Sequence, residues 1–317
     1  MRALPPPPPS HSPPTPALPY GPSVRDSRTG PPVAQDYLSL PQRSRQCPAG
    51  EDDRTDEQRL IFKNGLLHIN TFYAHPKTYV LLVNTALPEG AASAQPYEGR
   101  GWCCAERAMA AMVKSTYCLL DLQKLDGSET ECNDLVIKAA ANRATTVASP
   151  PAFRDWLLRG VESGEITFTN ATDAALVCDI YAAAFRVEFT RVVEMRYDQT
   201  GMGDKDACAL GEAIAFARDL GVLQSLELLD LSFNQIGDTG CAAIARALCE
   251  GAMPKLKSLR LRGNSIGDKG IAALADALAS VTLHETHGAL ADVRISGNPA
   301  SEGALQAVQA ATPAVVL

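Results

Sequence analysis

Apolar residues recur at a fixed interval in the C-terminal half of the chain. Residues 226–236 follow the order Leu-x-x-Leu-x-Leu-x-x-Asn-x-Ile, and residues 256–266 repeat it position for position. A third copy begins at Leu290, and an earlier, less regular copy begins at Val192. Apolar residues at alternate positions are typical of a short strand, and the Ala-rich segments that follow two of the copies have helical periodicity. The pattern therefore predicts a series of strand–helix units, with strands near 192–198, 226–232, 256–262 and 290–296.

Each regular copy places an asparagine after its strand: Asn234, Asn264 and Asn298. We expect the asparagine side chain to hydrogen-bond the backbone where the chain turns out of the strand. Asp238 and Asp268 come just after two of these turns, and we expect them to cap the helices that follow. This is the leucine-rich repeat pattern, and its long unit with a full helix resembles the ribonuclease-inhibitor type. The resemblance implies a short α/β solenoid over residues 161–317, in which neighbouring units share one core.

Alternate residues of each predicted strand point away from the helices, and the second such position is charged in every unit: Arg196, Asp230, Arg260 and Arg294. Neighbouring strands lie ~4.8 Å apart, so these four side chains form one column. We expect Asp230 to pair with Arg196 and Arg260, whereas Arg294 and the nearby Arg262 have no obvious partner in the column.

These charges have two interpretations. A column of paired, solvated side chains is the ordinary one. The other is contact with an acidic surface of a partner protein, because a guanidinium offers several donors in a planar fork. Under that interpretation, the candidate partner-binding residues are Arg196, Asp230, Arg260, Arg262 and Arg294.

Residues 33–160 alternate between strand and helix patterns. Thr78–Thr85 is a β-branched and aliphatic run typical of a buried, parallel strand. Trp102–Lys114 has helical periodicity, and Tyr117–Leu122 is a second short strand. Val33–Leu40 is a further strand candidate. The fold class that we expect is α/β, with a partial layered domain followed by the repeats.

Residues 100–106 read Arg-Gly-Trp-Cys-Cys-Ala-Glu and open the predicted helix after a strand and a loop of small residues. This arrangement resembles the TIR domain and the related heterokaryon-incompatibility domain, whose motif is Arg-x-Trp-x-x-x-Glu. Asp36–Gln42 is similar to the Asp and Gln-containing turn upstream in the latter family. The family's first strand and nucleotide-binding loop have no counterpart before Val33, so we expect an incomplete domain.

The resemblance implies a role for Glu106 as the catalytic carboxylate of an NAD glycohydrolase. In that role the carboxylate would stabilise an oxocarbenium-like transition state, as carboxylates do in other glycosidic cleavages. Trp102 would be a packing anchor. In the ordinary alternative, Glu106 is an ion-pair partner of Arg100 or Arg107 at the helix start, where the helix dipole favours a carboxylate.

Composition narrows the classes of function. Fourteen of the 22 prolines lie in residues 1–48, and we expect residues 1–32 to be a disordered leader, either simply low in complexity or a polyproline II ligand for an SH3- or WW-type domain. A net charge of −7 without Lys/Arg blocks argues against nucleic-acid binding. No apolar run reaches the ~20 residues that would cross a bilayer. Nine cysteines without a Cys-x-x-Cys pair favour reduced thiols and a cytoplasmic location.

Metal and nucleotide sites lack their motifs. His284–His287 offers two histidines but no third ligand, and the chain contains no Gly-x-x-x-x-Gly-Lys-Ser/Thr loop. We therefore expect no metal and no cofactor, with NAD a substrate only under the TIR-like alternative. The function that we predict is a protein–protein interaction scaffold or regulator that acts through the repeat face, without nucleic-acid or membrane partners. NAD cleavage at Glu106 is the alternative.

Overall fold

The computed structural model describes residues 51–84, 95–142, 146–170, 172–283, 290–311 and 315–316. The predicted leader (1–32), the strand candidate Val33–Leu40 and the segment His284–His287 lie outside the described residues. The chain divides into two compact units, residues 1–63 and 64–317. Helix α1 (Asp56–Tyr73) begins in the first unit, where Thr55 and Gln58 exchange backbone-to-side-chain hydrogen bonds of 2.9 and 3.2 Å that cap its first turn.

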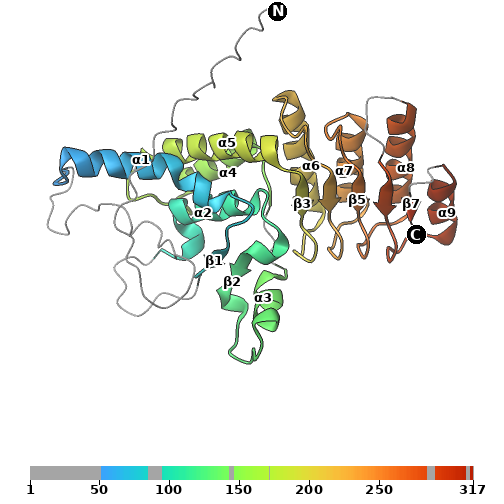
Figure 1. The fold of residues 1–317 in the computed structure, drawn as a ribbon, viewed down its shortest axis with the longest axis horizontal. Helices are drawn as coiled ribbons and strands as arrows, with labels where there is room; N and C mark the ends of the chain where they lie inside the picture. The colour runs from blue at the N-terminus through green and yellow to red at the C-terminus, as the bar shows by residue number, and fades with distance from the viewer. Residues whose placement is uncertain are drawn as a thin grey trace, which may run out of the picture. The chain divides into compact units, whose positions relative to one another are not determined.

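The predicted strand–helix–strand segment is present in the second unit (Figure 1). Strands β1 (Val80–Leu82) and β2 (Leu119–Asp121) are parallel, and helix α2 (Gly101–Ala111) lies between them in sequence. Leu82 is buried among residues of α2 and β2, but Leu81 is 56% exposed. The expectation of a buried strand is therefore wrong for one face of β1, because β1 and β2 form a two-stranded sheet that α2 covers on one side.

Further helices lie within this segment and between it and the repeats. They are η2 (Tyr97–Gly99), η3 (Thr116–Cys118), η4 (Leu122–Lys124), α3 (Cys132–Ala140), α4 (Pro150–Ser163) and α5 (Asp173–Arg191). Phe153 of α4 stacks on Tyr181 of α5, with ring centroids 3.9 Å apart. Across the described residues, no helix has both the length and the apolar character that crossing a membrane requires.

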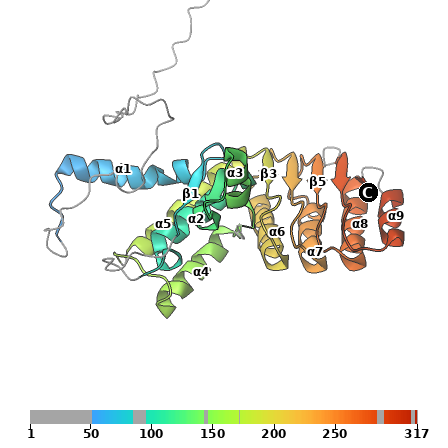
Figure 2. The same cartoon turned by 90° about the horizontal axis from the view of Figure 1, so that it is seen from below.

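Strands and helices alternate regularly after α5. They are β3 (Glu194–Arg196), α6 (Asp204–Asp219), β4 (Leu228–Asp230), α7 (Asp238–Cys249), β5 (Ser258–Arg260), α8 (Asp268–Leu283), β6 (Asp292–Arg294), α9 (Glu302–Ala311) and β7 (Val315–Val316). The strands form one parallel sheet in chain order, and helices α6 to α9 line one side of it (Figure 2). The first four strands lie within the ranges that the repeat predicts. The fifth, β7, is not among the strands that the repeat predicts.

Asp238 and Asp268 do not cap the helices that they begin. Asp238 Oδ1 accepts hydrogen bonds from Gly267 N (2.7 Å) and Gly270 N (2.8 Å), at the start of the next repeat's helix. Asp268 Oδ1 likewise accepts from Ser301 N at 2.6 Å, just before α9. The expectation that each caps its own helix is therefore corrected. The helix starts of adjacent repeats lie side by side, so each aspartate satisfies backbone donors of its neighbour.

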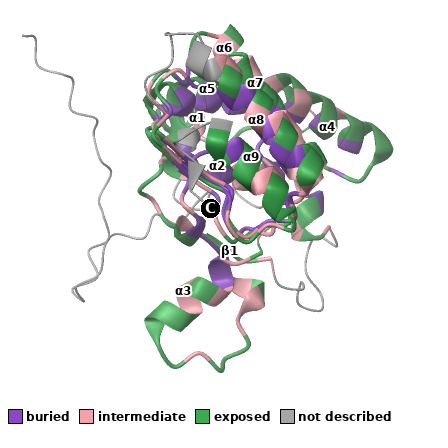
Figure 3. Ribbon diagram, turned by 90° about the vertical axis from the view of Figure 1, so that its right-hand side faces the viewer, coloured by how far each residue is buried: buried purple, intermediate pink, exposed green. Residues whose placement is uncertain are grey.

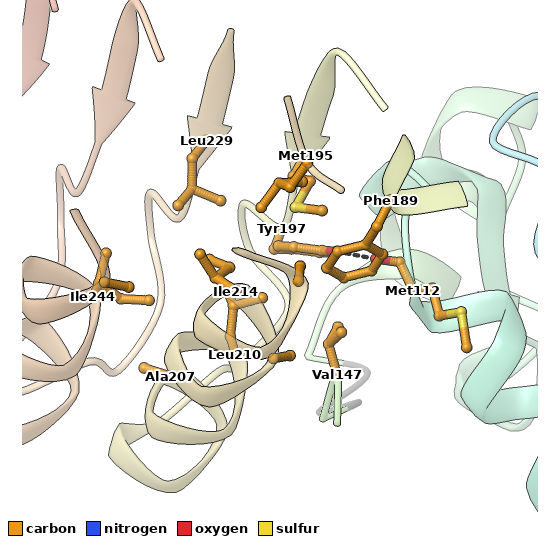
Figure 4. Close-up of a cluster of buried hydrophobic side chains, with 14 of the residues drawn as sticks. Met112, Val147, Phe189, Met195, Tyr197, Ala207, Leu210, Ile214, Leu229 and Ile244 are labelled. Carbon is orange, nitrogen blue, oxygen red and sulfur yellow. Dashed lines mark hydrogen bonds between the residues drawn. The ribbon is translucent and has the colours of Figure 1, made fainter. Parts of the chain in front are cut away.

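One large apolar cluster joins α2, α4 and α5 to the repeats, and two smaller clusters lie beside β1 and β2. The buried residues are purple in Figure 3. The inward residues of the first four repeat strands are fully buried: Met195, Leu229, Leu259 and Val293. At the start of the sheet, Tyr197 and Phe189 lie close to Met112, and the Tyr197 hydroxyl donates a hydrogen bond to the Met112 carbonyl (Figure 4). The core thus continues past residue 160, where the sequence predicts a domain boundary. That boundary stays a prediction.

Candidate protein-binding face

The asparagine turns hold successive repeats in register. Each of the three asparagines donates from Nδ2 to a carbonyl of its own repeat and to one of the preceding repeat, at 2.7–3.0 Å. Its Oδ1 accepts a backbone N–H of the preceding repeat at 3.0–3.1 Å. The side chains on the helix-free face of the sheet therefore stand in aligned columns.

The four residues of the predicted charged column lie opposite one another in the parallel sheet. Arg260 Nη1 lies 3.3 Å from Asp230 Oδ2, in the lateral pair that the sequence predicts. Arg196 instead pairs with Glu194 of its own strand, with 2.9 Å between Nε and Oε2. Residues two apart in a strand project from the same face, which brings this pair together.

The two arginines without a partner in the column differ in their surroundings. Arg294 has a partner outside the column, since its Nε lies 3.0 Å from Oδ1 of Asp292 in the same strand. Arg262 forms no ion pair with the described residues. Its guanidinium lies 5.3 Å from the centre of the Phe233 ring, within the range of a cation–π contact. Among the arginines in and beside the column, Arg262 is therefore the one whose charge has no carboxylate partner among the described residues.

A pocket of about 160 Å³ opens on this face. Side chains of four successive repeats line it: Asp198, Gln199, Asp230, Ser232, Phe233, Arg260, Arg262 and Arg294. Four of the five candidate partner-binding residues are thus brought together, and Arg196 is left outside. The sequence candidates did not include Asp198, Gln199, Ser232 or Phe233.

The pocket has two carboxylates on the β3 and β4 side. Partial burial, together with the nearby Asp230 carboxylate, raises the pKa of Asp198 above its ordinary value. Thr116 Oγ1 donates to the Asp198 backbone carbonyl at 2.7 Å and holds this residue in place. Asp230 was expected to face solvent but is 7% exposed, because it binds Arg260 and accepts a hydrogen bond from Ser232 N at 3.1 Å.

Phe233 occupies an unusual backbone position. The residue before the turn position has a positive φ in all four repeats: Gln199 (58°), Phe233 (56°), Gly263 (66°) and Gly297 (72°). Glycine adopts this left-handed conformation freely, whereas a bulky L-residue pays about 1–2 kcal/mol. Aligning the repeats would have shown from sequence that a phenylalanine stands where two other repeats have glycine. That contrast is the signal that could have identified Phe233.

Glu106 lies in the second turn of α2 and is half-buried. It lines neither the pocket on the repeat face nor a second pocket of about 430 Å³ beside Trp156. Trp102 Nε1 donates to Asp173 Oδ2 at 2.9 Å and so joins α2 to α5. Within the described ranges, no three His, Cys, Asp or Glu side chains gather where they could hold a metal ion. The role of Glu106 in NAD cleavage stays a prediction.

Comparison with known proteins identifies the repeats. A family model described as Leucine Rich repeat matches residues 222–245 and 252–275. No curated protein matches the chain. The two matched segments contain β4 with most of α7 and β5 with the first half of α8. The pattern of the sequence, the stacked strand–helix units and these two matches together support a leucine-rich repeat protein.

Proposed function

We propose that this chain is a protein-interaction scaffold or regulator of the ribonuclease-inhibitor-like type, with the helix-free face of its repeats as the binding surface. Stacked repeats offer an extended face whose outward side chains can vary without disturbing the core. Here the inward residues of the first four strands are fully buried and apolar, while the second outward position of each strand is charged. Packing of the core explains why the inward positions are apolar, and binding of a partner would explain why these outward positions are charged. A cytoplasmic location stays a prediction.

The observation that carries this proposal is the group of arginines at the pocket. A surface ion pair contributes only about 0–1 kcal/mol to stability, so the paired arginines add little to the stability of the fold. Arg262 forms no ion pair within the described chain, and the Arg294 side chain is 49% exposed despite its contact with Asp292. Both can present donors to a carboxylate of another protein. The partner that we propose is a protein with acidic side chains at its binding surface.

The test is a charge reversal on this face, compared with one on the helices. The double variant Arg262→Glu, Arg294→Glu replaces both donors by carboxylates, and Arg246→Glu is the control, since Arg246 is exposed on α7. Proteins that the full chain captures would be purified, and their Kd values measured at two salt concentrations. We expect the double variant to weaken binding by at least about tenfold, because removing close interfacial charge pairs costs on the order of 2 kcal/mol or more. Equal binding by the wild type and the double variant would refute the proposal that the partner binds at this surface.

A further inference from the structure

Phe233 presents an exposed aromatic ring at a backbone position that favours glycine. Phe233 is 51% exposed, so its ring gains little from burial. Two other repeats have glycine at this place, which shows that the turn forms without a large side chain. Folding alone therefore does not account for a phenylalanine here. Residues held in sparsely populated conformations are concentrated at functional sites.

The next repeat makes room for this ring. A Cβ atom at Gly263 would lie 2.7 Å from Cδ1 of Phe233, so the ring rests directly over the glycine. The guanidinium of Arg262 lies beside the same ring. Phenylalanine and arginine are thus held together in a preformed pair at the edge of the pocket. Aromatic and arginine side chains in such positions are typical of the residues that dominate binding at protein interfaces.

The charges of the pocket are separated by sign. Asp198 and Asp230 lie on the β3 and β4 side, while Arg262 and Arg294 belong to the β5 and β6 repeats. Arg260 lies between the two groups and binds Asp230. A uniformly acidic segment would place negative charge against Asp198 and Asp230, and like charges in contact oppose binding. The pocket therefore fits a ligand that is basic at one end and acidic at the other.

We propose that the pocket binds an extended segment of a partner protein that carries a lysine or arginine and, two or three residues away, an aspartate or glutamate. The basic side chain faces Asp198 and Asp230, the acidic one faces Arg262 and Arg294, and Phe233 packs against the segment between them. Two strand spacings span roughly 10 Å, which an extended peptide covers in about three residues. This proposal rests on the proposed function and adds the order of charges that the partner must present.

The experiment begins with peptides selected from a displayed random library on the full chain. Each enriched peptide would be synthesised together with a version in which its basic and acidic residues are exchanged. The Kd of both would be measured for the wild type, Phe233→Gly, Asp198→Asn, the double variant Arg262→Glu, Arg294→Glu and the helix-face control Arg246→Glu. We expect exchange of the charges and Phe233→Gly each to weaken binding at least about tenfold, and Asp198→Asn to weaken it severalfold. The Tm of Phe233→Gly should equal or exceed that of the wild type, because glycine relieves the left-handed conformation.

The outcomes separate this proposal from the function on which it rests. Enriched peptides that contain only acidic residues, and that bind through Arg262 and Arg294 regardless of Asp198, would overturn the charge order while leaving an acidic partner in place. Peptides that bind equally well to every variant of this face would overturn both. A Phe233→Gly variant with a lower Tm and unchanged affinity would assign Phe233 to the fold rather than to binding.

Discussion

Single asparagines connect the repeats of this protein. Asn264 is 7% exposed and reaches both ways along the stack. Its Nδ2 donates to Leu231 O of the preceding repeat (2.9 Å) and to Leu261 O of its own (3.0 Å), and its Oδ1 accepts from Ile236 N (3.1 Å). Leu231 O and Leu261 O also accept from the asparagines of the neighbouring repeats, Asn234 and Asn298, whereas Asn264 is the acceptor that satisfies Ile236 N.

Replacing this side chain should be costly. Asn264→Ala leaves the buried Ile236 N without its acceptor, at about 1–3 kcal/mol, and removes one of the two donors to Leu231 O and to Leu261 O. We expect the free energy of unfolding to fall by about 2 kcal/mol or more, measured by urea denaturation. Ser265→Ala is the matched control, since its side chain is exposed on the same turn. A loss below about 1 kcal/mol for Asn264→Ala would show that the turn does not depend on the amide.

The helices are joined to one another at their starts. Each first-turn aspartate accepts backbone N–H groups of the next helix, in the series Asp204 to Gly237, Asp238 to Gly267 and Asp268 to Ser301. These donors have no partner within their own helix. In the stack, the preceding repeat thus supplies the acceptor for the first N–H groups of a helix, which in an isolated helix comes from a capping residue.

This arrangement predicts different results for two substitutions of one residue. Asp238→Ala removes the acceptor for Gly267 N and Gly270 N and should lower stability by about 1–2 kcal/mol, as the loss of a cap does. Asp238→Asn keeps an acceptor oxygen and should cost less than half as much. Thermal unfolding of both variants measures the difference. Equal losses would assign the effect to the carboxylate charge at the helix start instead of to its hydrogen bonds.

The elements that the sequence predicts well are those with a repeating period. The strands near Leu229 and Leu259 follow from alternate apolar positions, because the sheet buries one face of each strand. The exposed face of β1 does not follow, since Tyr79, Leu81 and Val83 form an apolar run like that of a buried strand. Which face of a strand is covered depends on contacts with residues distant in sequence, and the hydrophobic pattern of the strand itself does not reveal those contacts.

The candidate site was predicted in part for a related reason. The register of parallel strands places Asp230, Arg260 and Arg294 in one column, and repeat spacing alone predicts this. The pairing of Arg294 with Asp292 depends on the choice of side-chain rotamer, which the sequence does not specify. Asp198 enters the pocket at the first repeat, where the pattern is least regular.

At the scale of the whole molecule, the segment from Met112 to Asn142 is packed onto the first repeat. The Tyr197 hydroxyl donates to Met112 O, and Thr116 Oγ1 donates to Asp198 O at 2.7 Å. Asn142 N donates to Gln199 O at 2.9 Å, so two separate segments hold the edge of the repeat sheet. An open sheet edge invites pairing with other chains, and these contacts cover this edge just past the end of β3.

This packing predicts that residues 64–317 unfold together. Both tryptophans of the chain, Trp102 and Trp156, precede residue 160, so their fluorescence reports on that part, while far-ultraviolet circular dichroism includes the repeats. We expect the two probes to give the same urea midpoint, as a cooperative unit does. Tyr197→Phe removes the bond to Met112 O and should lower both midpoints by the same amount, corresponding to about 1–2 kcal/mol. Separate midpoints, of which Tyr197→Phe shifts only one, would instead establish two domains that meet near residue 160.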